Sequence, residues 1–175
     1  DHVMGLDDCR RFCSINGHKA MPLYADKKTM NALKRVYQYA FDNPYQRGYF
    51  KPEPHLIEGT FNIGDLRITP FKLPHGNMGS LGFLFEQSGK KRLAYYNDCK
   101  NVPTAAVEAA HGAQLVLLDA LRPQQHPSHM TLDEALANAR RIGADKTVLT
   151  HLTDFYDHDR DEAELPLNVC FAYDG

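Results

Sequence analysis

Arg92-Leu93-Ala94-Tyr95-Tyr96-Asn97-Asp98 is a short β-favouring run that leads directly to a carboxylate. The same form recurs on both sides of it. His75 follows a strand-like run that ends at Leu73, and His151 follows the strand-like residues 148–150. Loops at strand ends are where a rigid sheet usually presents functional side chains. The recurrence therefore predicts a sheet with polar residues at the ends of its strands.

Outward from this stretch, the chain alternates between strand and helix patterns, which favours an α/β fold. Thr131 with Glu134 three residues later forms a capping-box pattern, which predicts a helix start at residue 132. Residues 40–54 read as an ordered loop, and no boundary separates the chain into parts, so we expect one domain over residues 1–175. We expect helices at residues 3–15, 28–39, 104–111 and 132–142, and strands at residues 22–25, 56–63, 66–73, 79–86, 92–96, 114–119, 146–150 and 167–172.

Composition sets broad limits on the class of protein. The 175 residues carry a formal net charge of -2, which argues against a broad nucleic-acid-binding surface. No apolar run approaches the roughly 20 residues that cross a bilayer, and no signal peptide opens the sequence. The four cysteines match no zinc or disulfide spacing, so they read as free thiols in a reducing compartment. We therefore expect a cytoplasmic protein.

The chemistry of the strand-end residues suits metal ions. Imidazole and carboxylate together favour Zn, Mn or Fe(II), and one carboxylate can bridge two ions. Two neighbouring ions can hold a phosphoryl group and activate water at neutral pH. On position alone, however, a single histidine such as His75 or His151 is more often a structural residue that makes a hydrogen bond.

An ordered series of short motifs narrows these alternatives. The series is Asp1-His2 with Gly5-Leu6-Asp7-Asp8-Cys9-Arg10, Leu73-Pro74-His75-Gly76, Tyr96-Asn97-Asp98, Asp119-Ala120-Leu121-Arg122, His126-Pro127-Ser128-His129, Thr150-His151-Leu152 and Ala172-Tyr173-Asp174-Gly175. It resembles the metallo-β-lactamase superfamily along nearly the whole chain. Within the superfamily, the closest likeness is to the phosphoribosyl cyclic phosphodiesterases of the carbon–phosphorus lyase pathway and their uncharacterised relatives.

The resemblance implies a four-layer αββα sandwich, with most of the N-terminal sheet lacking from the numbered chain, so that residues 1–175 form the C-terminal portion of the domain. It also implies two divalent metal ions, Zn or Mn, with Fe as a further candidate. Asp1 and His2 would end a His-x-His-x-Asp-His motif and hold the second ion, with Asp1 also counted as catalytic. His75 would bind the first ion, Asp98 would bridge both, and His151 would complete the second site.

Other residues are implied to act on the substrate. His129 matches the histidine near the scissile phosphate, where it could protonate the leaving oxygen or stabilise developing charge. His126 is a candidate substrate-binding residue, with packing of its loop as the alternative. Arg122 could bind a phosphate oxygen, or it could form a buried salt bridge with Asp119 or Asp133.

The implied activity is metal-dependent hydrolysis of a small (cyclic) phosphodiester through a metal-bound hydroxide. The alternatives are a tRNA-processing-like nuclease of the same superfamily and a non-catalytic fragment with an incomplete metal site. The expected partner is the small-molecule substrate, without nucleic acid or membrane, and a homodimer is an open alternative. Because two motif histidines would precede residue 1, we expect the 175-residue chain to bind at most one metal, weakly, and an upstream-extended chain to bind two.

Overall fold

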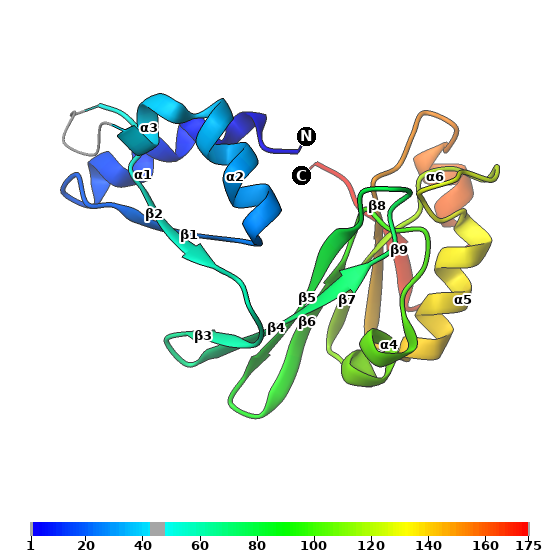
Figure 1. The fold of residues 1–175 in the computed structure, drawn as a ribbon. Coiled ribbons are helices and arrows are strands. Elements are labelled where there is room, and N and C mark those ends of the chain that lie inside the picture. The colour runs from blue at the N-terminus through cyan, green and yellow to red at the C-terminus, as the bar shows by residue number, and fades with distance from the viewer. Residues whose placement is uncertain (1, 43–47, 175) are drawn as a thin grey trace. The chain divides into compact units, whose positions relative to one another are not determined.

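The structure, a computed structural model, describes residues 2–42 and 48–174 (Figure 1). It divides into two compact units, residues 1–58 and residues 59–175, and each is described by itself. The α/β class predicted from the sequence is confirmed. The prediction of a single domain over the whole chain stays a prediction. Within the described residues, no helix is both long and apolar enough to cross a membrane.

The first unit combines short helices with a two-stranded parallel sheet. Its elements are η1 (Met4–Cys9), α1 (Arg10–Ile15), β1 (Met21–Ala25), α2 (Lys27–Val36), α3 (Gln38–Asp42) and β2 (Pro52–Leu56). The Asp26 side chain caps α2 by accepting the Thr29 N–H at 2.7 Å. The apolar faces of these elements bury one small core, formed by Cys13, Ala25, Met30, Leu33, Tyr37, Ala40 and Phe50.

Two predictions for the first unit were wrong in detail. The helix expected from residue 3 begins as the 3-10 turn η1, and the loop expected over residues 40–54 ends in strand β2. Pro52 and Pro54 argue against a strand in the sequence, because proline is rare in β-strands. A two-stranded sheet has only edge strands, where proline is tolerated, so both prolines fit. The central part of the expected loop, residues 43–47, lies outside the described residues.

The second unit is built on a seven-stranded mixed sheet whose strands lie in sequence order. They are β3 (Phe61–Ile63), β4 (Leu66–Leu73), β5 (Ser80–Gln87), β6 (Lys90–Tyr96), β7 (Leu115–Asp119), β8 (Lys146–Thr150) and β9 (Val169–Phe171). Neighbours from β3 to β6 are antiparallel, and neighbours from β6 to β9 are parallel. Strands β4, β6, β7 and β8 therefore run the same way, and their C-terminal ends reach one edge.

Helices α4 (Thr104–Ala110) and α5 (Leu132–Ile142) contribute to the main core of this unit. The predicted capping box of α5 is confirmed, because Thr131 accepts the Glu134 N–H and Glu134 accepts the Thr131 N–H. The core combines alternate residues of the sheet with residues of the two helices. The sheet contributes Leu84, Ala94, Tyr96, Val116, Leu118, Leu149 and Phe171, and the helices contribute Ala106, Ala110, Ala135 and Ile142.

The charged stretch before β9 contains the short helix α6 (His158–Glu162), which Asp157 caps by accepting the Arg160 N–H at 3.0 Å. One expectation for this unit also changed. The strand expected over residues 56–63 is divided. Its first residue, Leu56, is the last residue of β2 in the first unit, and only Phe61–Ile63 joins the large sheet.

Candidate active site

The candidate residues of the second unit gather at the edge where the like-directed strands end. His75 follows β4, Asp98 follows β6, Asp119 is the last residue of β7, and His151 follows β8. The strand-end pattern in the sequence therefore corresponds to one place in the fold, because parallel strands present their C-terminal ends at the same edge. The loop after β7 adds the other candidates.

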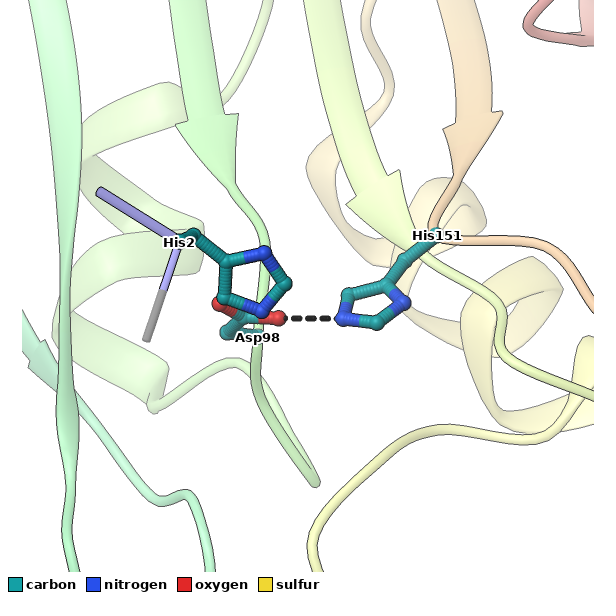
Figure 2. Close-up of side chains that lie close together, drawn as sticks. All are labelled: His2, Asp98 and His151. Carbon is teal, nitrogen blue, oxygen red and sulfur yellow. Dashed lines mark ion pairs between the residues drawn. The ribbon is translucent and has the colours of Figure 1, made fainter. Parts of the chain in front are cut away.

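Asp98 and His151 face each other at this edge. His151 Nε2 lies 2.6 Å from Asp98 Oδ1, and Figure 2 marks this ion pair with a dashed line. Both residues have left-handed backbones, with φ of 50° and 62°. Such a backbone costs a residue other than glycine roughly 1–2 kcal/mol, although aspartate and histidine tolerate it better than most. Strain of this kind gathers at functional sites.

His75 is held in one tautomer by the backbone of another loop. Its Nδ1 lies 3.1 Å from the carbonyl oxygen of Ser128. A carbonyl can only accept, so His75 Nδ1 carries the proton and Nε2 keeps its lone pair. This is the arrangement that metal-ligating histidines usually have, with one ring nitrogen donating to a carbonyl and the other free to bind the ion.

His129 is bonded to a buried carboxylate. Its Nδ1 lies 2.5 Å from Asp119 Oδ2, and the Asp119 side chain is fully buried. The N–H groups of Cys99 and Leu121 also donate to this carboxylate, at 3.0 and 3.1 Å. Burial raises the pKa of Asp119, and the hydrogen bond from His129 opposes that rise. The carboxylate thus fixes the His129 ring and leaves Nε2 available for chemistry.

His126 has the opposite tautomer. Its Nδ1 accepts the Ser128 N–H at 3.3 Å, so in the neutral ring Nε2 carries the proton. Burial lowers the pKa of His126, and the nearby charges of His129 and Arg122 lower it further. A neutral imidazole with a free N–H suits hydrogen bonding to a substrate oxygen better than metal ligation through Nε2.

The histidine rings cluster around His129. Its ring centroid lies 4.7 Å from those of His75 and His151, and 4.9 Å from that of His126. The nitrogen and oxygen donors of this cluster suit Zn, Mn or Fe(II). Asp98 and His151 are placed to hold a divalent cation, and His75 Nε2 is a further donor atom at the same sheet edge. The residues present therefore fit a metal centre.

Asp98, Asp119 and His129 also offer donor atoms within 4.8 Å of one another. Asp119, however, already accepts three hydrogen bonds, from His129, Cys99 and Leu121. An orienting role fits Asp119 better than ligation. The buried Cys99 thiol donates to the Tyr96 carbonyl oxygen at 3.5 Å, and burial raises its pKa.

The remaining predicted site residues are Arg122, His2 and Asp1. Arg122 donates from Nη2 to the carbonyl oxygen of Gln125 at 3.1 Å, a contact within its own loop. His2 belongs to the first unit, just before η1, and its place among the ligands stays a prediction. Asp1, predicted as ligand and catalytic residue, lies outside the described residues.

Sequence reasoning did not single out Asp119 as the partner of His129. The strand-end rule that selected Asp98 and His151 applies to Asp119 too, because it ends the buried run from Leu115. A hollow also opens beside His151, lined by residues 150–152 and 172–174. It offers room for part of a substrate next to the Asp98–His151 pair.

Comparisons with known proteins identify the family of this chain. Residues 1–152 match the model of the β-lactamase superfamily domain. An octanoyltransferase from Porphyromonas gingivalis strain W83 is 29% identical over 182 residues, covering 100% of this chain but 35% of that protein. The chain thus spans about a third of the length of this curated relative.

Two solved structures resemble the chain. A diphosphatase from the PhnP family is 31% identical with a TM-score of 0.84, covering 98% of this chain and 64% of its own. The metallo-β-lactamase fold protein YhfI from Bacillus subtilis is 20% identical with a TM-score of 0.76, covering 100% of this chain and 71% of its own. These likenesses confirm the predicted fold class. With the match over residues 1–152, they place the chain in the family that its motifs resemble: it belongs to the metallo-β-lactamase superfamily.

Proposed function

We propose that this chain carries the active site of a metal-dependent hydrolase that cleaves a small phosphodiester. One observation carries the proposal: His75, Asp98, His129 and His151 converge at one sheet edge, with a buried carboxylate behind His129. The likeness to a PhnP-family diphosphatase supports the phosphoryl class, because hydrolysis of a diphosphate and of a phosphodiester both proceed by attack of water on a phosphorus atom.

Asp98 and His151 would hold one ion, with Asp1 and His2 as further predicted ligands, and His75 with Asp98 would serve the other ion that the resemblance implies. Bound Zn²⁺, Mn²⁺ or Fe²⁺ would supply Lewis-acid polarisation of a phosphoryl oxygen and a lowered pKa of water. The tautomers described above keep His75 Nε2 ready as a donor atom. The Ser80 hydroxyl donates to the Asp98 carbonyl oxygen at 2.7 Å and so fixes the loop that presents the carboxylate.

His129 would act as the proton donor. Its Nδ1–H is committed to Asp119, so a second proton on Nε2 can pass to the leaving oxygen while the buried carboxylate stabilises the charged ring. A positioned acid of this kind contributes typically about 10²–10⁴-fold to the rate. The Nε2–H of His126 would bind a non-bridging phosphoryl oxygen and orient the group for attack.

Turnover measurements test this proposal. Both the 175-residue chain and an upstream-extended form would be supplied with Zn²⁺ or Mn²⁺ and assayed on bis(p-nitrophenyl) phosphate, a cyclic nucleotide, a phosphomonoester, a diphosphate and a precursor tRNA. We expect hydrolysis of the diesters in the extended form, and its loss in Asp98→Asn. The matched control is Arg67→Met, which removes an ion pair with Glu86 between β4 and β5.

Each contrary outcome points to a different function for this protein. Cleavage of precursor tRNA in preference to small diesters would favour the nuclease alternative. Hydrolysis of the diphosphate alone would move the substrate to the class named for the PhnP-family structure. An extended form that binds metal but hydrolyses none of these substrates would refute the proposal, and one that binds no metal would favour the non-catalytic alternative.

A further inference from the structure

Lys100 lies two residues after Asp98 and connects three loops of the candidate site. Its backbone N–H donates to the Pro74 carbonyl oxygen at 2.7 Å, which ties the Asp98 loop to the loop that carries His75. Its side chain reaches in another direction. Lys100 Nζ donates to Gln125 Oε1 at 3.0 Å and to both carboxylate oxygens of Glu134, at 2.9 and 2.8 Å.

Glu134 is itself a junction. Besides Lys100, it accepts the Thr131 N–H at 2.8 Å as part of the α5 capping box. Burial raises the pKa of Glu134, but the bonds from Lys100 and Thr131 outweigh it and hold that pKa below its usual range. Glu134 is therefore ionised at neutral pH. The Lys100 and Glu134 side chains are only 28% and 33% exposed, so water and salt screen their interaction less than that of a fully exposed pair.

Between these anchors runs a segment that carries the candidate catalytic residues. The Leu121 N–H donates to the Met130 carbonyl oxygen at 3.1 Å and closes residues 121–130 into a loop. His126 and His129 lie on this loop, and the hydrogen bond from Lys100 Nζ to Gln125 Oε1 connects Lys100 to it. The loop has no regular secondary structure of its own, so side-chain contacts must fix its position.

We infer that Lys100 is a positioning residue: its ion pair with Glu134 and its bond to Gln125 hold residues 121–130, with His126 and His129, against the Asp98 loop. The catalytic part of this inference rests on the proposed function, whereas the ordering of the loop does not. Among the described residues, the side-chain hydrogen bonds of Lys100 go to Gln125 and Glu134, so its effect would pass through the loop.

The test compares Lys100→Met with Arg67→Met. Methionine keeps the length of lysine but donates no hydrogen bond. Arg67 also forms a single ion pair, at 3.2 Å with Glu86, but this pair joins β4 and β5 instead of two site loops. Hydrogen–deuterium exchange of residues 121–130 reports loop order, and residues 104–110 of α4 serve as an internal reference. Metal content, kcat and KM are measured on the upstream-extended form.

We expect Lys100→Met to raise exchange of residues 121–130 and leave α4 and metal content unchanged. Loss of alignment at the reacting group should lower kcat roughly tenfold or more, with a smaller change in KM. Lys100→Arg should restore part of kcat, and Arg67→Met should behave as wild type. If Lys100→Met does not fold, Glu134→Gln removes the charge but keeps an acceptor for the Thr131 N–H, and the same changes are expected.

Wild-type exchange of residues 121–130 in the folded Lys100→Met variant would overturn the inference. So would a loosened loop with unchanged kcat, since Lys100 would then be a purely structural residue. A wild-type protein without phosphodiester turnover would refute the proposed function alone, because the exchange measurement then decides separately whether Lys100 orders the loop.

Discussion

Replacing Asp119 with asparagine should separate the orienting role of its carboxylate from simple packing. The substitution keeps the shape of the side chain and exchanges one oxygen for an NH₂ group. Asp119 Oδ2 accepts from His129 Nδ1 and the Cys99 N–H, and Oδ1 accepts from the Leu121 N–H. Each oxygen faces at least one donor, so either orientation of the amide sets its NH₂ against an N–H group.

The magnitude follows from that mismatch. A buried donor left without an acceptor costs about 1–3 kcal/mol of stability. Burial raises the pKa of Asp119, so a neutral side chain recovers part of the desolvation cost, and we expect a loss in the lower half of that range. The amide can donate to His129 Nδ1 as well as accept from it. The His129 tautomer is therefore no longer fixed, and turnover should fall about 10²–10⁴-fold.

Urea denaturation of the metal-free chain at pH 7 would measure the stability change, and nitrogen NMR of the imidazoles would report the His129 tautomer. Asp145→Asn is the matched control, because Asp145 is exposed on the same unit, at the turn before β8. If Asp119→Asn is as stable as Asp145→Asn and keeps a pure Nδ1–H tautomer at His129, the reasoning about this carboxylate is wrong.

Three further variants or treatments probe the same unit. His129→Ala should keep the metal content of the protein and lower turnover about 10²–10⁴-fold, as compared by metal analysis and rate assays; equal loss of metal would make His129 a ligand. Gly82→Ala should cost about 1–3 kcal/mol in urea denaturation, because the added Cβ would lie 2.6 Å from Tyr96 Cδ1 and 2.7 Å from Leu73 Cδ1. Iodoacetamide at pH 8 should leave Cys99 unmodified in the native protein and label it in urea, because its thiol is buried and burial raises its pKa; mass spectrometry of peptides would contradict this if Cys99 were labelled before unfolding.

Local patterns predicted the elements that present the site. The expected helix over residues 132–142 and the strand over residues 146–150 have the bounds of α5 and β8. The helix has strong local signals at both ends: a capping box begins it, and Gly143 ends it with a left-handed backbone, φ 60°. A strand-end position then located Asp98 and His151, because the strands before them run parallel.

Long-range pairing was beyond local patterns. Strand β2 contains Pro52 and Pro54, which argue against a strand, and its existence depends on pairing with β1 some thirty residues earlier. The roles within the histidine cluster were also hidden. The sequence shows histidines but not which ring nitrogen carries a proton, since that depends on partners brought near by folding.

The backbone of Ser128 sets the tautomers of two histidines. The Ser128 carbonyl accepts from His75 Nδ1, whereas the Ser128 N–H donates to His126 Nδ1. The same backbone residue therefore leaves one histidine with a bare Nε2 and the other with a protonated Nε2. Gly76, with φ 52°, lets the His75 loop approach closely, because a Cβ there would lie 3.3 Å from the Ser128 Cβ. His75, the proposed metal ligand, and His126, the proposed substrate-binding residue, thus have ring centroids 4.7 and 4.9 Å from that of His129, and their hydrogen-bond partners are the two backbone groups of one residue.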